Sequence, residues 1–596
     1  MIDFKEEEED KEVICDDYRL MVNKIFKQPI DYCKNTHLID KHIKSDLELL
    51  ESESDESDSV YNKLVSLDTE VGREVLENFS GKYSTNTKYL KDTQKLMKNL
   101  KDMMVDKHMI NNMTDFWMNI KTNKKFVETY QYLEFERFSY LNYSTVFLTW
   151  LTILNLFSPL LQVITPILLL LLPFLLMRSV SSHSGVTISN YIEGLKYVLS
   201  NNSLGKLILN FNSGSIQQKF QCIMFVSMYF YNLYQNMISC YKFYKSQFEI
   251  QKNLYLTKEY LNYTIQSYQY LINKINKCKL KQYGYNKISN DKFLQTIQQY
   301  KTKTEELHKK FDFVSEYMNY NYCSKPGTIM KTYYELYDST EIDDVMTYSL
   351  GFHGYFDILS SIVNKIKSKT IHKIRYSNKN ECKFTNIYHP CIDTKPVKNN
   401  IDFVKNKIIT GPNAAGKTTI LKSVIINIIL SQRFGYGYYT DGVINPYKYF
   451  HCYINIPDNC SRDSLFQAEA RRCKNILTTI KNNPNDRHFC VFDELYSGTN
   501  PYEAISSATS YLKYISQYDN VSFILTTHFM KICELLKNEN KIENCHMKTT
   551  QKQDTLTYFY KMILGISNIR GGISVLKQLN YPETIIQSAK NILNAI

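Results

Sequence analysis

The chain has 596 residues, of which 43% are hydrophobic, 14% aromatic and 22% charged, and its net charge is +12. At roughly 150 residues per domain this length predicts three or four domains, and the composition excludes a wholly disordered chain or a simple coiled coil. The 14 cysteines include no C-x-x-C pair, which argues against a zinc ribbon and against a secreted disulfide scaffold. The first 17 residues are acidic, so we expect no signal peptide.

The charge is unevenly distributed along the chain. Residues 1–58 hold 18 acidic and 8 basic residues, a balance of −10, so the remainder carries +22. A basic body fits a polyanionic partner, either nucleic acid or an anionic membrane face, although an A/T-rich genome would also enrich lysine and tyrosine. The acidic runs at 6–10 and 51–60 predict a disordered head over residues 1–60. Residues 61–137 are expected to form a polar helical region.

A long apolar stretch follows. Residues 138–177 contain no charged side chain, and a membrane span needs about 20 such residues. Asn155, Ser158 and Pro159 offer a turn in its middle, so we predict a transmembrane helical hairpin over 138–178, with the membrane contacted through 146–177. The alternative is an apolar helix pair in the core of a soluble domain.

A hairpin would leave both flanks on one side of the membrane. Basic residues are enriched on the cytosolic side of membrane spans. Those that flank this stretch are Lys124, Lys125, Arg137 and Arg178. We therefore expect a membrane-associated protein whose remaining domains face the cytosol.

Residues 185–350 are expected to form a helical core and lever arm. A second uncharged stretch, 220–241, begins a long helix in this interpretation, although another span stays open. A second helix is predicted over 291–318, joined to the first near Gly284 to make an antiparallel arm. The many tyrosines of the arm either stack on nucleic-acid bases or pack between helices.

The last third, 351–596, is predicted to be an α/β domain. Its strongest motif is an apolar strand, Lys407–Thr410, followed by Gly411-x-x-x-x-Gly416-Lys417-Thr418 and an apolar helix. Glycines in such a loop let backbone N–H groups surround phosphate oxygens at a helix N-terminus. Lys417 would reach the β- and γ-phosphates of ATP and Thr418 would hold Mg²⁺. The alternative is a glycine turn that binds nothing.

Two further apolar strands end in polar residues. Asp493 and Glu494 follow the strand that begins at His488, and His528 follows the strand that begins at Val521. Asp493 is suited to the Mg²⁺ side of a nucleotide site, Glu494 to polarising the attacking water, and His528 to contacting the γ-phosphate.

Together these motifs resemble the MutS family of DNA mismatch-repair ATPases. Four segments carry the resemblance: TGPNAAGKTT at 410–419, DSLFQAEARRCKNIL at 463–477, FDELYSGTN at 492–500 and TTHF at 526–529. The resemblance extends to FDILSSI at 356–362, YHPCID at 388–393, ENCHM at 543–547, YKMILG at 560–565 and residues 571–589.

The resemblance implies an ABC-type ATPase that works as a dimer and couples ATP hydrolysis to DNA binding. The implied nucleotide contacts are the phosphate-loop residues Gly411, Pro412, Asn413, Ala414, Ala415, Gly416, Lys417, Thr418 and Thr419, together with Ser464. Ser464, Phe466 and Glu469 match the family's signature, and Ser464 would act on the nucleotide of the partner subunit. Gly498 and Thr499 match the segment after the carboxylate pair.

The sequence also departs from that family. Ala415 replaces a glycine, Glu503-Ala504 replaces Asp-Gly, and no segment resembles the mismatch-recognition or connector domain. The chain looks closest to short, membrane-associated MutS-like ATPases.

The fold class expected overall is multidomain, α plus α/β. Two functions stay open: an ATPase coupled to DNA binding, with double-stranded DNA and a second copy of the chain as partners, or a membrane-embedded mechanochemical ATPase that binds no DNA. An ABC transporter and an SMC-like protein are disfavoured, because no LSGGQ-type signature is present and the arms are short.

Overall fold

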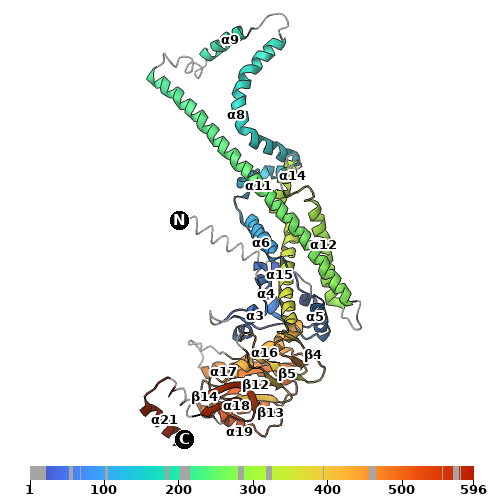
Figure 1. Cartoon of the computed structure of the whole chain (residues 1–596), viewed down its shortest axis with the longest axis vertical. Helices are drawn as coiled ribbons and strands as arrows, with labels where there is room; N and C mark the ends of the chain where they lie inside the picture. Colours follow the sequence, from blue (N-terminus) through green and yellow to red (C-terminus); the bar gives the residue numbers. More distant parts are fainter. Residues whose placement is uncertain are drawn as a thin grey trace. The chain divides into compact units, whose positions relative to one another are not determined.

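The structure is a computed structural model of the whole chain, shown in Figure 1. It describes all residues except 1–21, 53–57, 68, 101–104, 181–186, 202–214, 280–286, 317–324, 393–394, 455–464, 553–554, 568, 570–572, 574–575, 578 and 596. The described residues combine helices with α/β sheets, as the sequence predicts.

The described residues form two compact units, each assembled from separate stretches of sequence. The helical unit contains residues 115–263 and 303–345. The α/β unit contains residues 22–114, 264–302 and 346–596. Four helices contribute residues to both units: α6 (Lys107–Thr122), α11 (Ile216–Lys279), α12 (Lys287–Lys309) and α15 (Thr340–Lys367).

A six-stranded sheet is the centre of the α/β unit. Its strands lie in the order β10 (Tyr449–Tyr453), β11 (His488–Asp493), β12 (Val521–Thr527), β7 (Asn406–Thr410), β13 (Ile542–Lys552) and β14 (Thr555–Leu564). The first five are parallel, and β14 pairs antiparallel with β13. Nearly every residue of β7, β11 and β12 is buried, which requires cover on both faces of the sheet.

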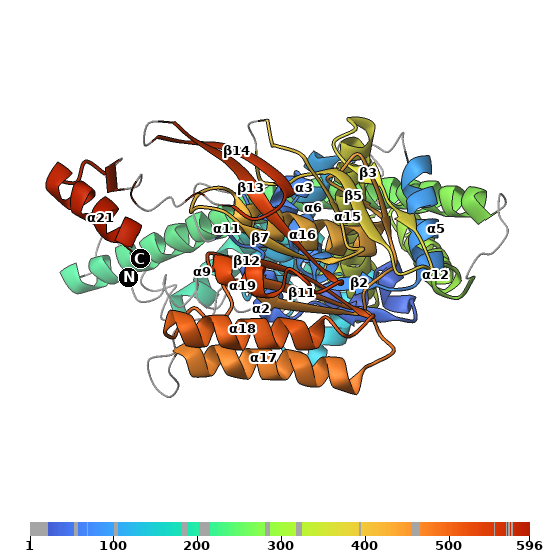
Figure 2. The same ribbon diagram turned by 90° about the horizontal axis from the view of Figure 1, so that it is seen from below.

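Helices supply that cover, as Figure 2 shows. On one face, α17 (Leu465–Asn482), α18 (Pro501–Ile515) and α19 (Met530–Leu535) share a core with β11 and β12. On the other lies α16 (Lys417–Phe434), which is buried along most of its length.

Two smaller sheets adjoin the main one. One has the order β4 (Arg375–Tyr376), β9 (Asp441–Ile444), β5 (Cys382–Ile387) and β6 (Asn399–Asp402), and the other pairs β3 (His372–Lys373) with β8 (Tyr436–Gly437). The Asn399 side chain joins β6 to β14, since it donates to the carbonyl of Tyr560 at 3.0 Å and accepts from the N–H of Met562 at 2.8 Å. This link fixes one wall of the pocket beside the phosphate loop.

The prediction of disorder over 1–60 is wrong for the part that the structure describes, residues 22–52 and 58–60. Val22, Ile30, Leu47 and Val60 are fully buried there. The prediction relied on the high average acidity of the segment and did not take these scattered apolar residues into account. The acidic runs at 6–10 and 53–57 lie outside the described residues. The elements of this region are η1 (Pro29–Tyr32), β1 (Thr36–Leu38), α2 (Lys41–Asp46), α3 (Val60–Leu64), α4 (Glu70–Ser80), β2 (Lys82–Ser84), which pairs with β1, and α5 (Thr87–Asn99).

Residues 22–100, the N-terminal segment, hold the end of α16. Arg433 in the last turn of α16 is 3% exposed, and its Nε donates to the carbonyl of Phe79 at 2.6 Å. Its guanidinium also binds the side-chain oxygen of Gln28 and lies 3.8 Å from the centroid of the Phe79 ring. Thr69 donates to Asp357 of α15 at 2.8 Å, so the N-terminal segment contacts both helices.

Aromatic packing orders the arm residues of the α/β unit. The rings of Tyr300 and Tyr348 stack with centroids 3.6 Å apart, and Tyr268 is fully buried against Phe352 at 4.5 Å. These tyrosines therefore pack between helices, which is one of the two alternatives that the sequence left open. The helix predicted over 291–318 is α12, which ends at Lys309 because a turn follows at 310–313.

In the helical unit, aromatic side chains gather on α14 (Pro326–Asp338). Phe126 stacks on Tyr337 with centroids 4.1 Å apart, and the Tyr132 hydroxyl donates to the carbonyl of Met330 at 2.7 Å. Lys121 donates to the carbonyl of Tyr337 at 2.7 Å. The remaining helices of this unit are α7 (Phe126–Thr129), η2 (Glu136–Tyr143), α8 (Thr145–Val180) and α9 (Ile188–Asn201).

The hairpin turn predicted inside 138–178 is wrong. α8 is one helix of 36 residues that continues through Pro159, Pro166 and Pro173. The polar residues expected in the turn find partners instead: Ser158 donates to the carbonyl of Asn155 at 3.1 Å and to the side chain of Asn236 on α11 at 2.7 Å. Because those groups are satisfied within helices, they do not force the chain to turn.

We predict that Arg433→Met destabilises the α/β unit by about 2 kcal/mol, because the buried carbonyl of Phe79 and the amide of Gln28 lose their partner. The midpoint of thermal unfolding, followed by scanning fluorimetry, should fall by roughly 2–4 °C per kcal/mol. Arg375→Met is the matched control, since Arg375 is 67% exposed in its pair with Asp441 and its loss should cost under about 0.5 kcal/mol. Equal midpoints for the two variants would contradict the structural role of the N-terminal segment.

Candidate functional site

The candidate site begins where β7 meets α16. The loop 411–416 follows Thr410, and Gly416 adopts a left-handed φ of 87° immediately before the helix. Ala414 has φ 61°, a conformation that costs an L-residue roughly 1–2 kcal/mol. The first N–H groups of any α-helix lack intrahelical partners and favour anions. The loop therefore presents donors for an anion at the carboxyl edge of the sheet.

Lys417 is held inside this loop. Its ammonium donates to the carbonyls of Gly411 at 3.0 Å and Pro412 at 3.3 Å, and it lies 3.3 Å from Nε2 of His528. Burial lowers the pKa of Lys417, an effect opposed by the nearby Glu494 and Asp493 carboxylates. The carbonyl contacts hold the cation where a phosphate oxygen would compete for it.

Asp493 joins three elements at one point. The Thr418 hydroxyl on α16 donates to one oxygen of Asp493 at 2.8 Å, and the Thr526 hydroxyl on β12 binds the other. The strand register explains this, because Asp493 on β11 pairs directly with Thr526, and Thr527 pairs with Thr410 of β7. The hydroxyl and carboxylate oxygens gathered here are hard ligands of the kind that Mg²⁺ prefers.

Glu494 and His528 lie within hydrogen-bonding distance of each other at the same edge. Nε2 of His528 lies 2.6 Å from the Glu494 carboxylate, and both side chains are partly exposed. This hydrogen bond, aided by the charge of Lys417, lowers the pKa of Glu494, while burial opposes the shift. Glu494 therefore stays ionised at neutral pH, and the stabilisation that its ionised form contributes is lost as pH falls through the lowered pKa. The structure thus brings Lys417, Thr418, Asp493, Glu494 and His528 together.

Glu469 controls the loop that follows Glu494. It is 2% exposed on α17, and its carboxylate accepts from the Ser497 N–H, the Ser497 hydroxyl and the Gly498 N–H, each at 3.1 Å. Glu494 and Tyr496 in this loop have positive φ values of 52° and 60°, so the loop needs such support. Through this contact Glu469 links α17 to the position of Glu494.

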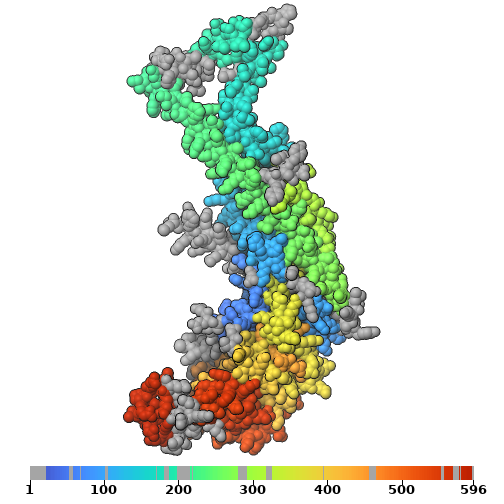
Figure 3. All heavy atoms as spheres, viewed as in Figure 1, coloured from blue at the N-terminus to red at the C-terminus, as the bar shows by residue number. Residues whose placement is uncertain are grey.

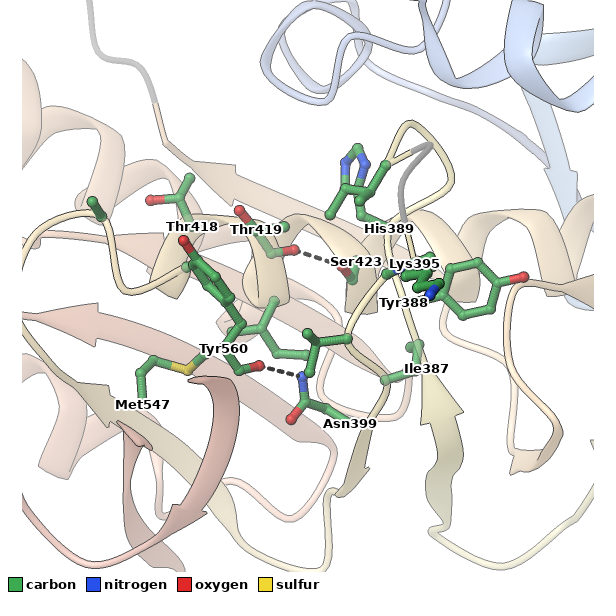
Figure 4. Close-up of a pocket in the computed structure, with 16 residues that line it drawn as sticks. Ile387, Tyr388, His389, Lys395, Asn399, Thr418, Thr419, Ser423, Met547 and Tyr560 are labelled. Atoms are coloured by element: carbon green, nitrogen blue, oxygen red, sulfur yellow. Dashed lines mark hydrogen bonds between the residues drawn. The ribbon is translucent and has the colours of Figure 1, made fainter. Parts of the chain in front are cut away.

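A cavity of about 530 Å³ opens beside the phosphate loop (Figure 4). Its walls come from three directions: residues 387–399 on one side, Met547 and Tyr560 from β13 and β14 below, and the first turns of α16. Tyr560 lies close to Gly416, where an added Cβ would come within 3.1 Å of the ring. The mixture of aromatic, aliphatic and amide groups suits a planar heterocycle joined to the bound anion.

Sequence reasoning missed the cavity walls. Tyr388, His389, Asn399, Met547 and Tyr560 line the cavity, yet the YHPCID and YKMILG segments suggested only a resemblance, because nothing local indicates that they converge. Burial lowers the pKa of His389 to about 4, so its imidazole is neutral at pH 7. Ser464 lies outside the described residues, whereas Phe466 is placed beside Tyr496 with ring centroids 5.7 Å apart.

A mostly parallel sheet with a glycine-rich loop, a carboxylate pair and a histidine at one edge is the architecture of an ATPase domain. Residues 407–596 match the family description MutS domain V. The carboxy-terminal part of the chain, residues 407–596, is therefore similar to the ATPase domain of the MutS family.

Individual relatives agree with this match. The chain is 27% identical over 217 residues to DNA mismatch repair protein spellchecker 1 of Drosophila melanogaster, covering 35% of this chain and 23% of that protein. It is 29% identical over 247 residues to DNA mismatch repair protein MutS of Persephonella marina, covering 40% and 28%. With MutS of Finegoldia magna the identity is 29% over 191 residues, covering 32% and 22%. The chain thus matches less than a third of the length of each of these relatives.

We predict that Glu469→Gln lowers the rate of ATP hydrolysis at saturating ATP about tenfold, because hydrogen bonds to a charged acceptor contribute about 1.5–3 kcal/mol and the Glu494 loop loses that support. The KM for ATP should stay within about twofold, since Glu469 touches neither the phosphate loop nor the cavity wall. Glu503→Gln is the control: this exposed carboxylate accepts only locally, from Thr499 at 2.6 Å, and its variant should match the wild type. An equal fall in the rate of ATP hydrolysis in both variants would refute the role of Glu469 in positioning the Glu494 loop.

Proposed function

We propose that the α/β unit binds and hydrolyses ATP. The observation that carries the proposal is the convergence of Lys417, Thr418, Asp493, Glu494 and His528 at one sheet edge, beside a cavity of about 530 Å³. The cavity receives the base, and residues 411–419 receive the phosphates at the helix N-terminus.

The residues present suit a magnesium nucleotide. Thr418 and Asp493 would hold Mg²⁺, which supplies charge neutralisation on the β- and γ-phosphate oxygens. Lys417 exchanges its contacts with the Gly411 and Pro412 carbonyls for phosphate oxygens, a trade of neutral hydrogen bonds for stronger charge-assisted ones.

Glu494 and His528 take complementary roles in hydrolysis. The ionised Glu494 carboxylate orients and polarises the attacking water, and His528 contacts the γ-phosphate. In the structure each is the other's partner at 2.6 Å, so nucleotide must separate them before both can act. The pair therefore keeps the site inactive until a triphosphate engages His528.

By the resemblance to the MutS family, two copies of the chain close face to face over bound ATP. Ser464 would then donate to the γ-phosphate held by the partner subunit. α17 begins at Leu465, one residue beyond Ser464, so the same helix that carries Glu469 follows the signature serine. Dimer closure would thus reach the Glu494 loop through a single helix.

We propose further that ATP hydrolysis is coupled to binding of double-stranded DNA. The relatives reported above are named DNA mismatch repair proteins, and the chain beyond residue 58 carries a net charge of +22 that would neutralise phosphates.

A second candidate function is a membrane-embedded mechanochemical ATPase that acts on a bilayer or a protein partner without binding DNA. It is favoured by α8, whose residues 145–168 include a stretch with a mean hydropathy of 1.7 in which 6% of the residues are buried. In this function the ATPase domain faces the cytosol.

We predict that Lys417→Ala abolishes ATP hydrolysis and that Glu494→Gln lowers it by a factor of about 10²–10⁴ while ATP still binds, because the γ-phosphate contacts remain but the water loses its base. Steady-state phosphate release and filter binding of labelled ATP measure the two effects. Glu534→Gln serves as the surface control, since Glu534 pairs only with Lys531 at 3.0 Å. Wild-type turnover in Glu494→Gln would remove its assigned role.

DNA coupling predicts binding that weakens steeply with salt. The purified full chain should bind duplex or branched DNA at low salt, with log K falling linearly against log salt, and ATP should change the affinity. Fluorescence anisotropy between 50 and 200 mM salt, as a range in which phosphate contacts are strongly screened, measures this. No binding to duplex, mismatched or branched DNA at the low end, with ATP hydrolysis intact, would leave the membrane-embedded function.

A further inference from the structure

Within the helical unit α8 and α11 run antiparallel and contact each other between residues 156–162 of α8 and 229–240 of α11, and beyond these contacts the two helices separate (Figure 1). The Asn236 side chain accepts from the Ser158 hydroxyl and donates to the side-chain oxygen of Gln162, both at 2.7 Å. Toward the start of α11 the Tyr229 hydroxyl donates to the carbonyl of Gln162 at 3.2 Å, and further along the Cys240 thiol donates to the carbonyl of Leu156 at 3.2 Å. The contacts run in opposite directions along the two helices.

The outward surface of this pair is apolar and exposed. Figure 3 shows both helices leaving the rest of the helical unit toward α9, which lies at their far end. Large apolar side chains on each helix are roughly half exposed, among them Leu160, Leu171, Ile223, Phe225, Phe230 and Met237. Contiguous apolar surface of this kind marks a lipid or protein contact on a folded protein.

The length and the charges of the pair fit a bilayer. Residues 220–241 of α11 are uncharged and lie between Lys219 and Lys242. At 1.5 Å per residue these 22 residues span about 33 Å, close to the hydrocarbon thickness of about 30 Å. At the other end of α8, Arg178 follows the apolar run. Cations at both limits would contact lipid headgroups.

The internal hydrogen bonds explain how polar side chains enter such an environment. In hydrocarbon an unpaired amide costs several kcal/mol, so polar groups in spanning helices bond across to a neighbouring helix. Ser158, Gln162 and Asn236 bond to one another between α8 and α11 instead of facing outward. The pairing would thus allow α11 to enter the bilayer although its polar residues lower its mean hydropathy. Among the described residues, α8 is the helix that is long and apolar enough by itself to cross a membrane.

We infer that α8 and residues 220–241 of α11 cross a lipid bilayer together as an antiparallel pair, with α9 on the far side. The two-helix insertion that the sequence analysis placed inside 138–178 is thereby formed from segments about 80 residues apart in the chain. Both flanks of the pair remain on one side of the membrane. The inference concerns the helical unit and does not depend on ATP hydrolysis.

Protease protection of the full chain in sealed vesicles with the cytosolic face outward tests this topology. Epitope tags are placed at the N-terminus, between α9 and α11, and at the C-terminus. The expected result is digestion of both terminal tags and protection of the internal one. Digestion of all three tags means that no helix crosses, and protection of both the internal and the C-terminal tags means that α8 crosses alone. Either of the last two results overturns the inference.

A matched pair of lysine variants gives an independent readout. Phe230 and Tyr244 on α11 are 61% and 49% exposed, so a soluble helix would tolerate lysine equally at both. In a bilayer Phe230 lies near the middle of the span and Tyr244 outside it, and lysine is strongly disfavoured at the middle. Phe230→Lys should lower the fraction with a protected internal tag and a digested C-terminal tag several-fold, and Tyr244→Lys should leave it unchanged. Equal fractions in the two variants would overturn the inference.

Discussion

The hydrogen bonds of the Asp493 carboxylate hold together the elements that form the candidate site of the α/β unit. It receives the Thr418 hydroxyl from α16 and the Thr526 hydroxyl from β12, so one side chain fixes the helix of the phosphate loop against two neighbouring strands. Glu494, the next residue, therefore stands at a defined distance from Lys417 and His528. The site is a property of the strand register and not of a flexible loop.

The far end of α16 is held as firmly as its start. Arg433 is buried against Phe79 and Gln28, and in the middle of the helix Lys422 pairs with Glu48 at 2.6 Å. The N-terminal segment also reaches α15 through Thr69 and Asp357. A shift of α16 would thus be transmitted to Glu48 and Phe79, which precede their partners on α16 by more than 300 residues in sequence.

Local motifs made much of the site predictable. The loop 411–418, the carboxylate pair and His528 each follow an apolar strand, and parallel strands deliver their ends to one edge. The cavity wall could not be predicted from the sequence, because Tyr388 and Tyr560 are distant in the chain and meet at the cavity only in the folded structure. The prediction of disorder over residues 1–60 was wrong for a similar reason. Val22, Phe26 and Ile30 are buried by elements that are distant in sequence, so their part in the core cannot be recognised locally. The turn predicted at Asn155, Ser158 and Pro159 does not form, and Ser158 instead donates a hydrogen bond to Asn236 on α11.

The comparison of α16 with α8 shows what sequence alone leaves undecided. From the sequence both are predicted to be apolar helices. α16 is buried along most of its length, between the sheet and the N-terminal segment, and its polar Asn427 and Gln432 bond to the backbone of Ser423 and Tyr447. α8 has its polar groups satisfied by α11 but no comparable cover for its leucines. An apolar helix with satisfied polar groups and an uncovered surface is stable only where the solvent itself is apolar, which is the physical reason to seek a bilayer around α8 and α11.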